Sequence, residues 1–350
     1  MRKKYRILLF AVLAIVLIGG YIIYSNPLAK RWFVNKISFK ETKHNEKFDM
    51  TTYSGHVIKD ISFAENVKTY DNKSENLQLD IYLPEDADTS KQYPLVLCIH
   101  SGGFLVGNKE QTANLCAGFA KSGFVAATLN YRLGWGKDRS LACNGDSLEL
   151  KKAIYRAVQD TKASLRFLVH NAHQYSIDTN WIFVQGASAG AVTTLHTAFM
   201  KQNNIEKFLP KNVVESFGSI DNSGNNLTDH FTIRAICNCW GSFCDVNLID
   251  SSNALPGIFF HGAMDKVTPF EKGNVYSCDK FMTAYGSKSI YDKLQQLQVP
   301  AIAHFEKDMG HNLAKELFYM ENAICFFKKI VNKDTITSAV YNTTETSCGE

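Results

Sequence analysis

The chain is 350 residues long, with 45% apolar and 21% charged residues and a formal net charge of +4 at pH 7. This length can bury a sizeable core, and the composition is ordinary for a globular protein. No basic run interleaved with aromatic residues occurs, which argues against nucleic acid as a partner.

The chain begins with a targeting segment. Basic residues between Arg2 and Arg6 precede an uncharged run from Ile7 to Ile23. The length of this run lies between a signal-peptide core and a minimal membrane span, and no small-x-small cleavage site follows it. We expect residues 1–24 to be an uncleaved signal anchor that holds an exported domain at the membrane. A cleaved signal peptide, with a secreted or periplasmic protein, is the alternative.

The nine cysteines are many for a cytosolic enzyme. Export favours disulfides, and the odd number leaves at least one thiol unpaired. Cys98 lies in an apolar strand and Cys325 in an apolar helix, so both are expected to be buried free thiols. Cys237, Cys239 and Cys244 lack the second pair of ligands that zinc sites require, so no metal is expected.

Residues 25–55 have no clear periodicity and are expected to connect the membrane to a domain at 56–331. Strands and helices then alternate, and continuous apolar runs such as Pro94–His100 are typical of strands buried in a parallel sheet. This pattern predicts an α/β fold with a mostly parallel central sheet and helices on both faces. The expected strands are His56–Phe63, Leu77–Pro84, Pro94–His100, Phe124–Asn130, the run from Trp181, Thr232–Trp240, Leu255–His261 and Val299–Glu306. The expected helices are Asn114–Ser122, Lys151–Asn171, one that ends near Met200, and Glu316–Val331.

Three further expectations concern the segments around these elements. Asn203–Phe231 is predicted to be a loop, and Asn332–Glu350 a disordered polar tail. Asp160 and Arg166, within the long helix, are expected to form a structural salt bridge along the helix or a contact with a strand end.

A strand that begins at Trp181 leads directly into Gly-x-Ser-x-Gly at residues 186–190, and helical spacing follows. A serine hydroxyl is a poor nucleophile unless it is held exposed beside a base, and a tight strand–turn–helix connection holds it so. The flanking glycines let strand and helix approach closely, and the helix N-terminus favours a developing oxyanion. Ser188 is therefore a candidate nucleophile, with a glycine-rich turn that has no chemistry as the alternative.

Other candidate residues lie at the ends of further strands. Gly102 and Gly103 follow the strand Pro94–His100 and could direct backbone N–H groups into a cleft. Among the ten histidines, only His311 lies in a glycine-flanked loop just past the last strand, and Asp265 follows the strand before it. His196 and His304 lie inside a helix and a strand, so they are expected to be structural. All the candidates follow the carboxyl ends of strands, where open α/β sheets place their sites.

These motifs resemble the α/β-hydrolases of the carboxylesterase/lipase type, close to the feruloyl-esterase-like and hormone-sensitive-lipase-like branches. The resemblance covers about Asn76 to Val331 and rests on His-Gly-Gly-Gly, Gly-x-Ser-x-Gly, His-Gly-x-x-Asp and Gly-His; Ser101 replaces the first glycine. It implies an α/β-hydrolase fold and a serine esterase that needs no metal or cofactor. The residues implied are Ser188 as nucleophile, His311 as base, Asp265 as its orienting acid, and the N–H groups of Gly102, Gly103 and Ala189 as oxyanion hole.

We therefore expect a carboxylic ester hydrolase for short-acyl, sugar or aromatic esters, because Asn203–Phe231 is too polar to shelter a long acyl chain. A serine peptidase of the prolyl-oligopeptidase type is one alternative, although the chain before Pro94 is too short for that family's large extra domain. A non-catalytic hydrolase-fold binding protein is the other, although such proteins usually lose one of the three reactive residues. The expected partners are a small ester and, through the N-terminal segment, a membrane.

Overall fold

The computed structural model describes residues 52–88, 90–136, 143–311, 316–342 and 346–349. The expected signal segment at 1–24 and most of the expected connector at 25–55 lie outside the described residues. No helix within the described ranges is long and apolar enough to cross a membrane.

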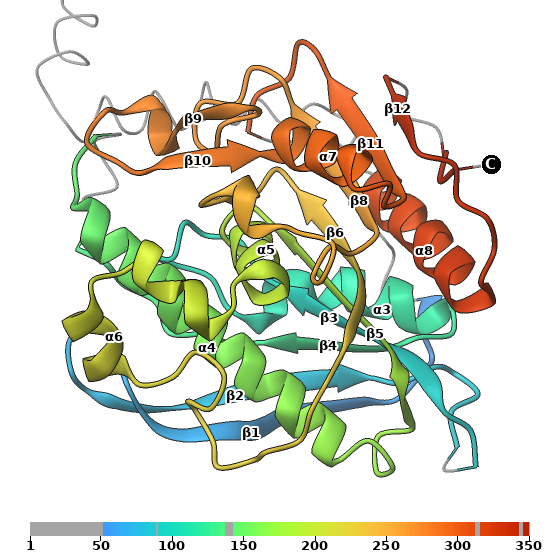
Figure 1. The fold of residues 1–350 in the computed structure, drawn as a ribbon. Coiled ribbons are helices and arrows are strands. Elements are labelled where there is room, and N and C mark those ends of the chain that lie inside the picture. The colour runs from blue at the N-terminus through green and yellow to red at the C-terminus, as the bar shows by residue number, and fades with distance from the viewer. Residues whose placement is uncertain (1–51, 89, 137–142, 312–315, 343–345, 350) are drawn as a thin grey trace, which may run out of the picture. The chain divides into compact units, whose positions relative to one another are not determined.

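A nine-stranded sheet forms the centre of the described domain, in the order β1-β2-β4-β3-β5-β6-β8-β11-β12 (Figure 1). From β4 to β12 all neighbouring strands are parallel, and only β2 runs antiparallel to its neighbours β1 and β4. The mostly parallel sheet expected from the sequence is therefore confirmed. The strands are β1 (Val57–Lys68), β2 (Ser74–Tyr82), β3 (Tyr93–Ile99), β4 (Val125–Leu129), β5 (Ile177–Ala187), β6 (Ile233–Cys239), β8 (Gly257–Gly262), β11 (Ala301–Glu306) and β12 (Ala339–Tyr341).

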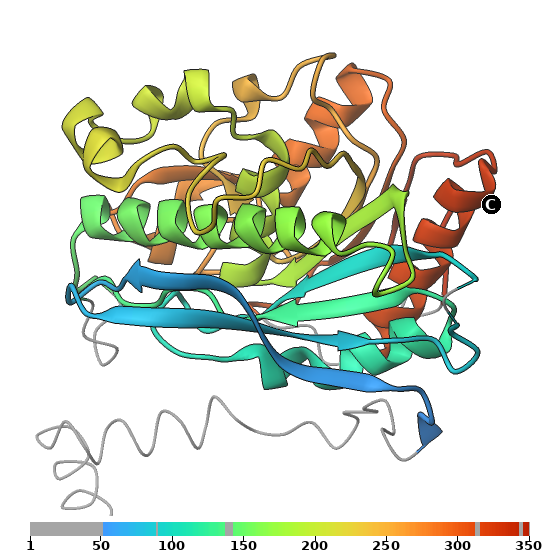
Figure 2. The ribbon, with the colours of Figure 1, turned by 90° about the horizontal axis from the view of Figure 1, so that it is seen from below.

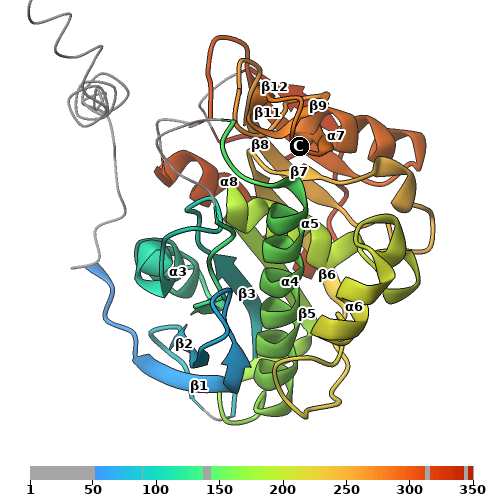
Figure 3. The same ribbon diagram turned by 90° about the vertical axis from the view of Figure 1, so that its left-hand side faces the viewer.

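Helices cover both faces of this sheet, each over its own apolar cluster. Figure 3 shows α3 (Ala113–Lys121) and α8 (Glu316–Asn332) on one side of the sheet. The opposite side carries α4 (Ser147–His170), α5 (Ala189–Phe199) and α7 (Ser287–Gln296). Side chains of β3 from Leu95 to Ile99 are fully buried between these layers, which explains the continuous apolar run in the sequence.

The strand order reverses at β3. The chain passes from β3 to β4 on one side and later places β5 on the other side of β3. The connections that follow β3 and β5 therefore diverge, and the carboxyl ends of these strands border the crevice where open α/β sheets bind ligands. The segments that follow Ile99 and Ala187 therefore lie at this crevice.

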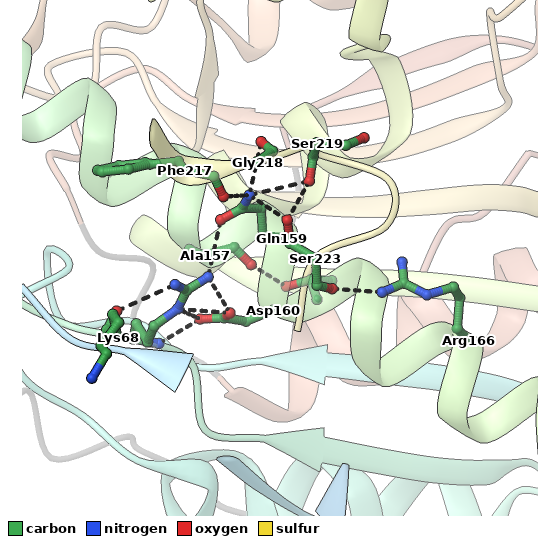
Figure 4. Close-up of polar contacts among 11 residues, drawn as sticks. Lys68, Ala157, Gln159, Asp160, Arg166, Phe217, Gly218, Ser219 and Ser223 are labelled. Atoms are coloured by element: carbon green, nitrogen blue, oxygen red, sulfur yellow. Dashed lines mark hydrogen bonds and ion pairs between the residues drawn. The ribbon is translucent and has the colours of Figure 1, made fainter. Parts of the chain in front are cut away.

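Helix α4 lies beside β1 (Figure 2). It is amphipathic, but it also carries buried polar residues that bond to neighbouring segments. Asp160 is fully buried and lies 2.7 Å from the guanidinium of Arg132, which follows β4. Gln159 donates to the carbonyls of residues 217–219, and Arg166 donates to the carbonyl of Ser223 (Figure 4). Asp160 thus makes the expected contact with a strand end. The expected pairing along the helix with Arg166 is wrong, because the Arg166 side chain bonds backbone carbonyls instead.

Two segments expected to lack structure contain regular elements. Asn203–Phe231 holds the 3₁₀-helix η3 (Gln202–Lys207) and α6 (Lys211–Phe217), so its description as a loop is wrong over these residues. Ile205 of η3 and Val213 of α6 are buried, but each element is too short to show a period in the sequence.

The expected disorder of the tail Asn332–Glu350 is wrong for β12, which pairs with β11 and forms the edge of the sheet. Cys348 forms a disulfide with Cys325 of α8, so the prediction of a free Cys325 is also wrong. The covalent link to α8 holds a polar segment that has little apolar surface of its own to bury. Cys98 is buried and free, as predicted, and Cys143 forms a second disulfide with Cys278.

Candidate active site

Ser188 lies on a sharp turn between β5 and α5. Its backbone has φ of 54° and ψ of −119°, a left-handed conformation that a non-glycine residue adopts only under constraint. A Cβ atom on Gly190 would lie 2.1 Å from the carbonyl oxygen of Ile99, so only glycine fits where α5 begins beside β3. The strand, turn and helix predicted from Gly-x-Ser-x-Gly are confirmed, and the turn exposes the serine side chain at the crevice.

Three side chains predicted to act together form a hydrogen-bonded chain. The Oγ of Ser188 lies 2.7 Å from Nε2 of His311, and Nδ1 of His311 lies 2.7 Å from Oδ2 of Asp265. An ionised carboxylate only accepts hydrogen bonds, so Nδ1 carries the proton and Nε2 is left to accept from the serine hydroxyl. This is the protonation state that a general base beside a hydroxyl requires.

Asp265 is held by its own turn as well as by His311. Its Oδ1 accepts from the backbone N–H groups of Val267 at 2.7 Å and Thr268 at 3.1 Å. Burial alone would raise the pKa of Asp265, but hydrogen bonds from His261 and His311 outweigh burial and hold the pKa below its ordinary value. The carboxylate therefore stays ionised at neutral pH.

The glycine pair after β3 adopts the turn that the oxyanion prediction needs. Gly102 and Gly103 have φ of 118° and 63°, and the carbonyl of Gly103 accepts from the indole N–H of Trp135 at 2.9 Å. Within the described residues, no acceptor is bonded to the backbone N–H groups of Gly102, Gly103 or Ala189. Donors without a partner at the ends of β3 and β5 suit an oxygen that gains negative charge.

Ser101, where the sequence departs from the family pattern, lies at the start of this glycine turn. Its carbonyl oxygen lies 2.7 Å from Nδ1 of His100, and the hydroxyl of Tyr131 donates to the carbonyl of His100 at 3.0 Å. These two contacts hold the start of the glycine turn. The substitution therefore leaves the backbone at Gly102 and Gly103 in a glycine-type conformation.

A small apolar cavity opens beside Ser188. Its volume, counted as the space open to the centre of a water-sized sphere, is about 30 Å³. Its apolar walls come mainly from Phe104, Leu150, Ile154, Val192, Val275 and Met282. The disulfide between Cys143 and Cys278 joins the approach to α4 to the segment just after η5 (Val275–Ser277), and so ties two walls together. These walls could not be identified from the sequence, because they come from residues far apart along the chain.

The sequence analysis also missed His261 as a member of the site. The sequence analysis gave His261 a place at the end of an expected strand and in the motif His-Gly-x-x-Asp but no role, yet its Nε2 lies 3.1 Å from Oδ2 of Asp265. The spacing His-Gly-x-x-Asp was the available signal, since a tight turn after a strand can bring residues four apart together. His196 and His304, predicted to be structural, are both buried away from this chain of hydrogen bonds.

Comparison with known proteins shows the family and the fold of the chain. A family model described as BD-FAE matches residues 79–254. Carboxylesterase 1C of Rattus norvegicus is 31% identical over 118 residues, which are 33% of this chain and 20% of that protein. Liver carboxylesterase 1 of Oryctolagus cuniculus is 26% identical over 197 residues, 53% of this chain and 32% of that protein. The chain thus spans about a third or less of these curated relatives.

Similar solved structures agree in fold. A truncated carbohydrate esterase from gut microbiota aligns with a TM-score of 0.55 and 17% identity, covering 82% of this chain and all (100%) of that chain. A butyrate-bound esterase from Thermogutta terrifontis aligns with a TM-score of 0.53 and 17% identity, covering 77% of this chain and 94% of that one. At this identity the likeness shows the fold alone, and the α/β-hydrolase fold expected from the sequence is confirmed.

The depressed pKa of Asp265 makes a prediction for stability. A carboxyl group whose pKa is lowered by folding stabilises the protein above its unfolded pKa of about 4, and this contribution is lost as the pH falls toward the folded value. Between about pH 5 and pH 2 the free energy of unfolding should therefore fall more steeply in the wild type than in Asp265→Asn. Urea unfolding at a series of pH values measures this difference.

The matched control is Asp308→Asn, which changes an exposed carboxyl group. It should follow the wild-type pH dependence. Equal slopes for the wild type and Asp265→Asn would show that the Asp265 pKa is not depressed by folding.

Proposed function

The chain belongs to the BD-FAE family, with the α/β-hydrolase fold of the carboxylesterase/lipase type, and from this premise we propose that it is a serine-dependent carboxylic ester hydrolase. The observation that carries the proposal is the chain of hydrogen bonds from Ser188 through His311 to Asp265, both at 2.7 Å. A serine hydroxyl, an imidazole and an ionised carboxylate in this order are the groups that acyl transfer requires.

In the proposed reaction, Nε2 of His311 takes the proton of Ser188 as Oγ attacks the ester carbonyl carbon. The N–H groups of Gly102, Gly103 and Ala189 stabilise the oxyanion, and Asp265 stabilises the imidazolium. Protonated His311 then gives its proton to the leaving alcohol, and an acyl-enzyme on Ser188 remains. Water, activated by the same imidazole, attacks this ester, and the carboxylic acid leaves with the Ser188 hydroxyl restored.

Replacing the nucleophile tests this mechanism. Ser188→Ala should lower kcat for p-nitrophenyl acetate by about 10⁴–10⁶, because attack, acyl transfer and proton transfer all depend on Oγ. His311→Ala should lose nearly as much, since the two residues act as a unit. The urea midpoints of both variants should stay close to that of the wild type.

A purified Ser188→Ala protein that keeps most of its esterase activity would contradict the mechanism. An anilide of the same acyl group, assayed in parallel, separates the proposed esterase from a peptidase. The esterase should cleave the ester far faster than the amide.

We propose further that the preferred acyl groups are short. Counted as space open to the centre of a water-sized sphere, one water molecule needs roughly 10–15 Å³. The cavity beside Ser188 offers about 30 Å³ by the same measure, so it admits an acyl chain of only a few carbons. The similar esterase of Thermogutta terrifontis was solved with butyrate, a short acid, which agrees with this size. Ile154 of α4 forms part of the cavity wall and is nearly fully buried.

A series of p-nitrophenyl esters from acetate to palmitate measures the acyl preference. We expect kcat/KM to peak between acetate and butyrate, and Ile154→Ala to move the peak to longer chains. Each newly buried methylene contributes about 0.8 kcal/mol, which is about fourfold in kcat/KM. Val158→Ala, one turn further along α4 and outside the cavity, should leave the order of the esters unchanged. A wild-type peak at palmitate would contradict the short-acyl proposal.

We also propose that the protein is exported and attached to a membrane through residues 1–24. Besides the basic and apolar pattern of that segment, the disulfides Cys143–Cys278 and Cys325–Cys348 support the proposal, because disulfides persist in oxidising compartments. The full-length protein should sediment with membranes, and a truncated chain that begins at Ser25 should be soluble and active. A mature N-terminus near residue 25, found by N-terminal sequencing, would replace the anchor with a cleaved signal peptide.

A further inference from the structure

A second histidine lies behind Asp265, on the side away from Ser188. His261, at the end of β8, is fully buried, and its Nε2 lies 3.1 Å from the same Oδ2 that accepts from His311. Its Nδ1 lies 2.7 Å from the hydroxyl of Ser287, the first residue of α7. The amide of Asn238, on β6, donates to that hydroxyl at 2.8 Å. Residues of β6, α7 and β8 thus form one chain of hydrogen bonds that ends on this carboxylate oxygen.

The directions of these hydrogen bonds follow from the groups themselves. The carboxylate of Asp265 can only accept, so Nε2 of His261 carries the proton. Burial lowers the pKa of His261, so the ring is neutral and its Nδ1 accepts from the Ser287 hydroxyl. The hydroxyl oxygen in turn accepts from Asn238. The chain of donors runs from Asn238 through Ser287 and His261 to Asp265, and it leaves His261 a single tautomer.

The carboxylate is fully satisfied only when His261 is counted. Oδ1 accepts from the N–H groups of Val267 and Thr268, and Oδ2 accepts from His311 and His261. These are four donors for the roughly four lone-pair positions of a carboxylate. The Thr268 hydroxyl lies closer to the carbonyl of Trp240, at 2.7 Å, than to Oδ2, at 3.0 Å, and has only one proton to give. Without His261, one lone pair of a buried anion would lose its partner.

Building on the proposed function, we propose that His261, backed by Ser287 and Asn238, is a positioning residue that fixes Asp265 toward His311. It does so as a neutral donor. A cation at this position would compete with the imidazolium of His311 for the charge of Asp265, whereas a neutral N–H orients the carboxylate and leaves most of its charge available. The titratable groups that face His261 are Asp265 and His311, and the other neighbours, Ser287, Asn238 and Phe270, carry no charge.

Two substitutions of His261 separate positioning from packing. His261→Phe keeps a ring of similar size and removes both ring nitrogens, while His261→Gln can place a side-chain N–H near the position of Nε2. Ser287→Ala leaves the His261 ring in place and removes the donor that fixes its tautomer. His304→Phe is the matched control: His304 is equally buried on the neighbouring strand β11 but stacks on Phe260, away from Asp265.

We expect His261→Phe to lower kcat for p-nitrophenyl acetate by about 10- to 100-fold with little change in KM, the effect of losing one hydrogen bond to a charged group. The acid limb of the pH profile of kcat/KM should move to higher pH. Fewer donors on Asp265 leave more of its charge to stabilise protonated His311, which raises the pKa that this limb reports. His261→Gln should recover most of the rate and of the wild-type profile, Ser287→Ala should be intermediate, and His304→Phe should resemble the wild type.

A wild-type rate and profile in His261→Phe would overturn the positioning role. A loss of kcat in His261→Gln as large as that in His261→Phe would also overturn it. The same holds if His304→Phe loses as much kcat as His261→Phe and the acid limb shifts in neither variant. If His261→Phe does not fold, Ser287→Ala decides the question, and a wild-type profile in that variant counts against the proposal.

The outcomes for the positioning role and for the proposed function remain distinct. A wild type that is active, with an inactive Ser188→Ala and an unaffected His261→Phe, refutes only the positioning role. If the wild type hydrolyses no ester, the proposed function fails. The pKa of His311, followed by the ring resonances of ¹³C-labelled histidine, then tests the positioning role in the wild type and His261→Phe, and an unchanged pKa would refute it.

Discussion

The left-handed backbone of Ser188 is the constraint on which the rest of the site depends. A conformation of this kind costs on the order of 1–3 kcal/mol and persists only where the surroundings hold it. Here β5 ends between β3 and β6, the N–H of Ser188 donates to the carbonyl of Cys239 at 2.9 Å, and α5 begins in contact with the end of β3. The strands are rigid because they are buried on both faces. They hold the turn in place, and the turn holds the Ser188 hydroxyl at a fixed position in the crevice.

Hydrogen bonds stabilise the charge of Asp265. Asp265 is a buried anion that accepts from backbone N–H groups and from the rings of His261 and His311, and no lysine or arginine among the described residues forms an ion pair with it. Its charge is therefore available when His311 becomes positive during the proposed reaction. A lysine or arginine near Asp265 would have stabilised the resting carboxylate more strongly and weakened this effect. Elsewhere in the domain, the buried Asp160 is paired directly with Arg132, as a purely structural carboxylate can be.

Much of this arrangement could be predicted from the sequence, because parallel strands and glycine-flanked turns leave local signals. The continuous apolar runs identified β3 and β5, and Gly-x-Ser-x-Gly identified the turn that follows β5. The position of His311 and Asp265 after successive strands was enough to place them on one edge of the sheet. The contacts that could not be predicted join segments without a periodic pattern. These include the Cys325–Cys348 disulfide and the pairing of the tail through β12. In each case both partners look ordinary in the sequence, and only the tertiary fold brings them together.

Covalent labelling with a fluorophosphonate tests the central claim most directly, because only a serine activated by its surroundings attacks the phosphorus atom at an appreciable rate. After reaction of the native full-length protein, peptide mass spectrometry should find one adduct, on Ser188. The adduct should be absent from protein unfolded in urea before the reaction. No adduct in the native protein, an adduct on another serine, or equal labelling of the native and unfolded chains would contradict the account.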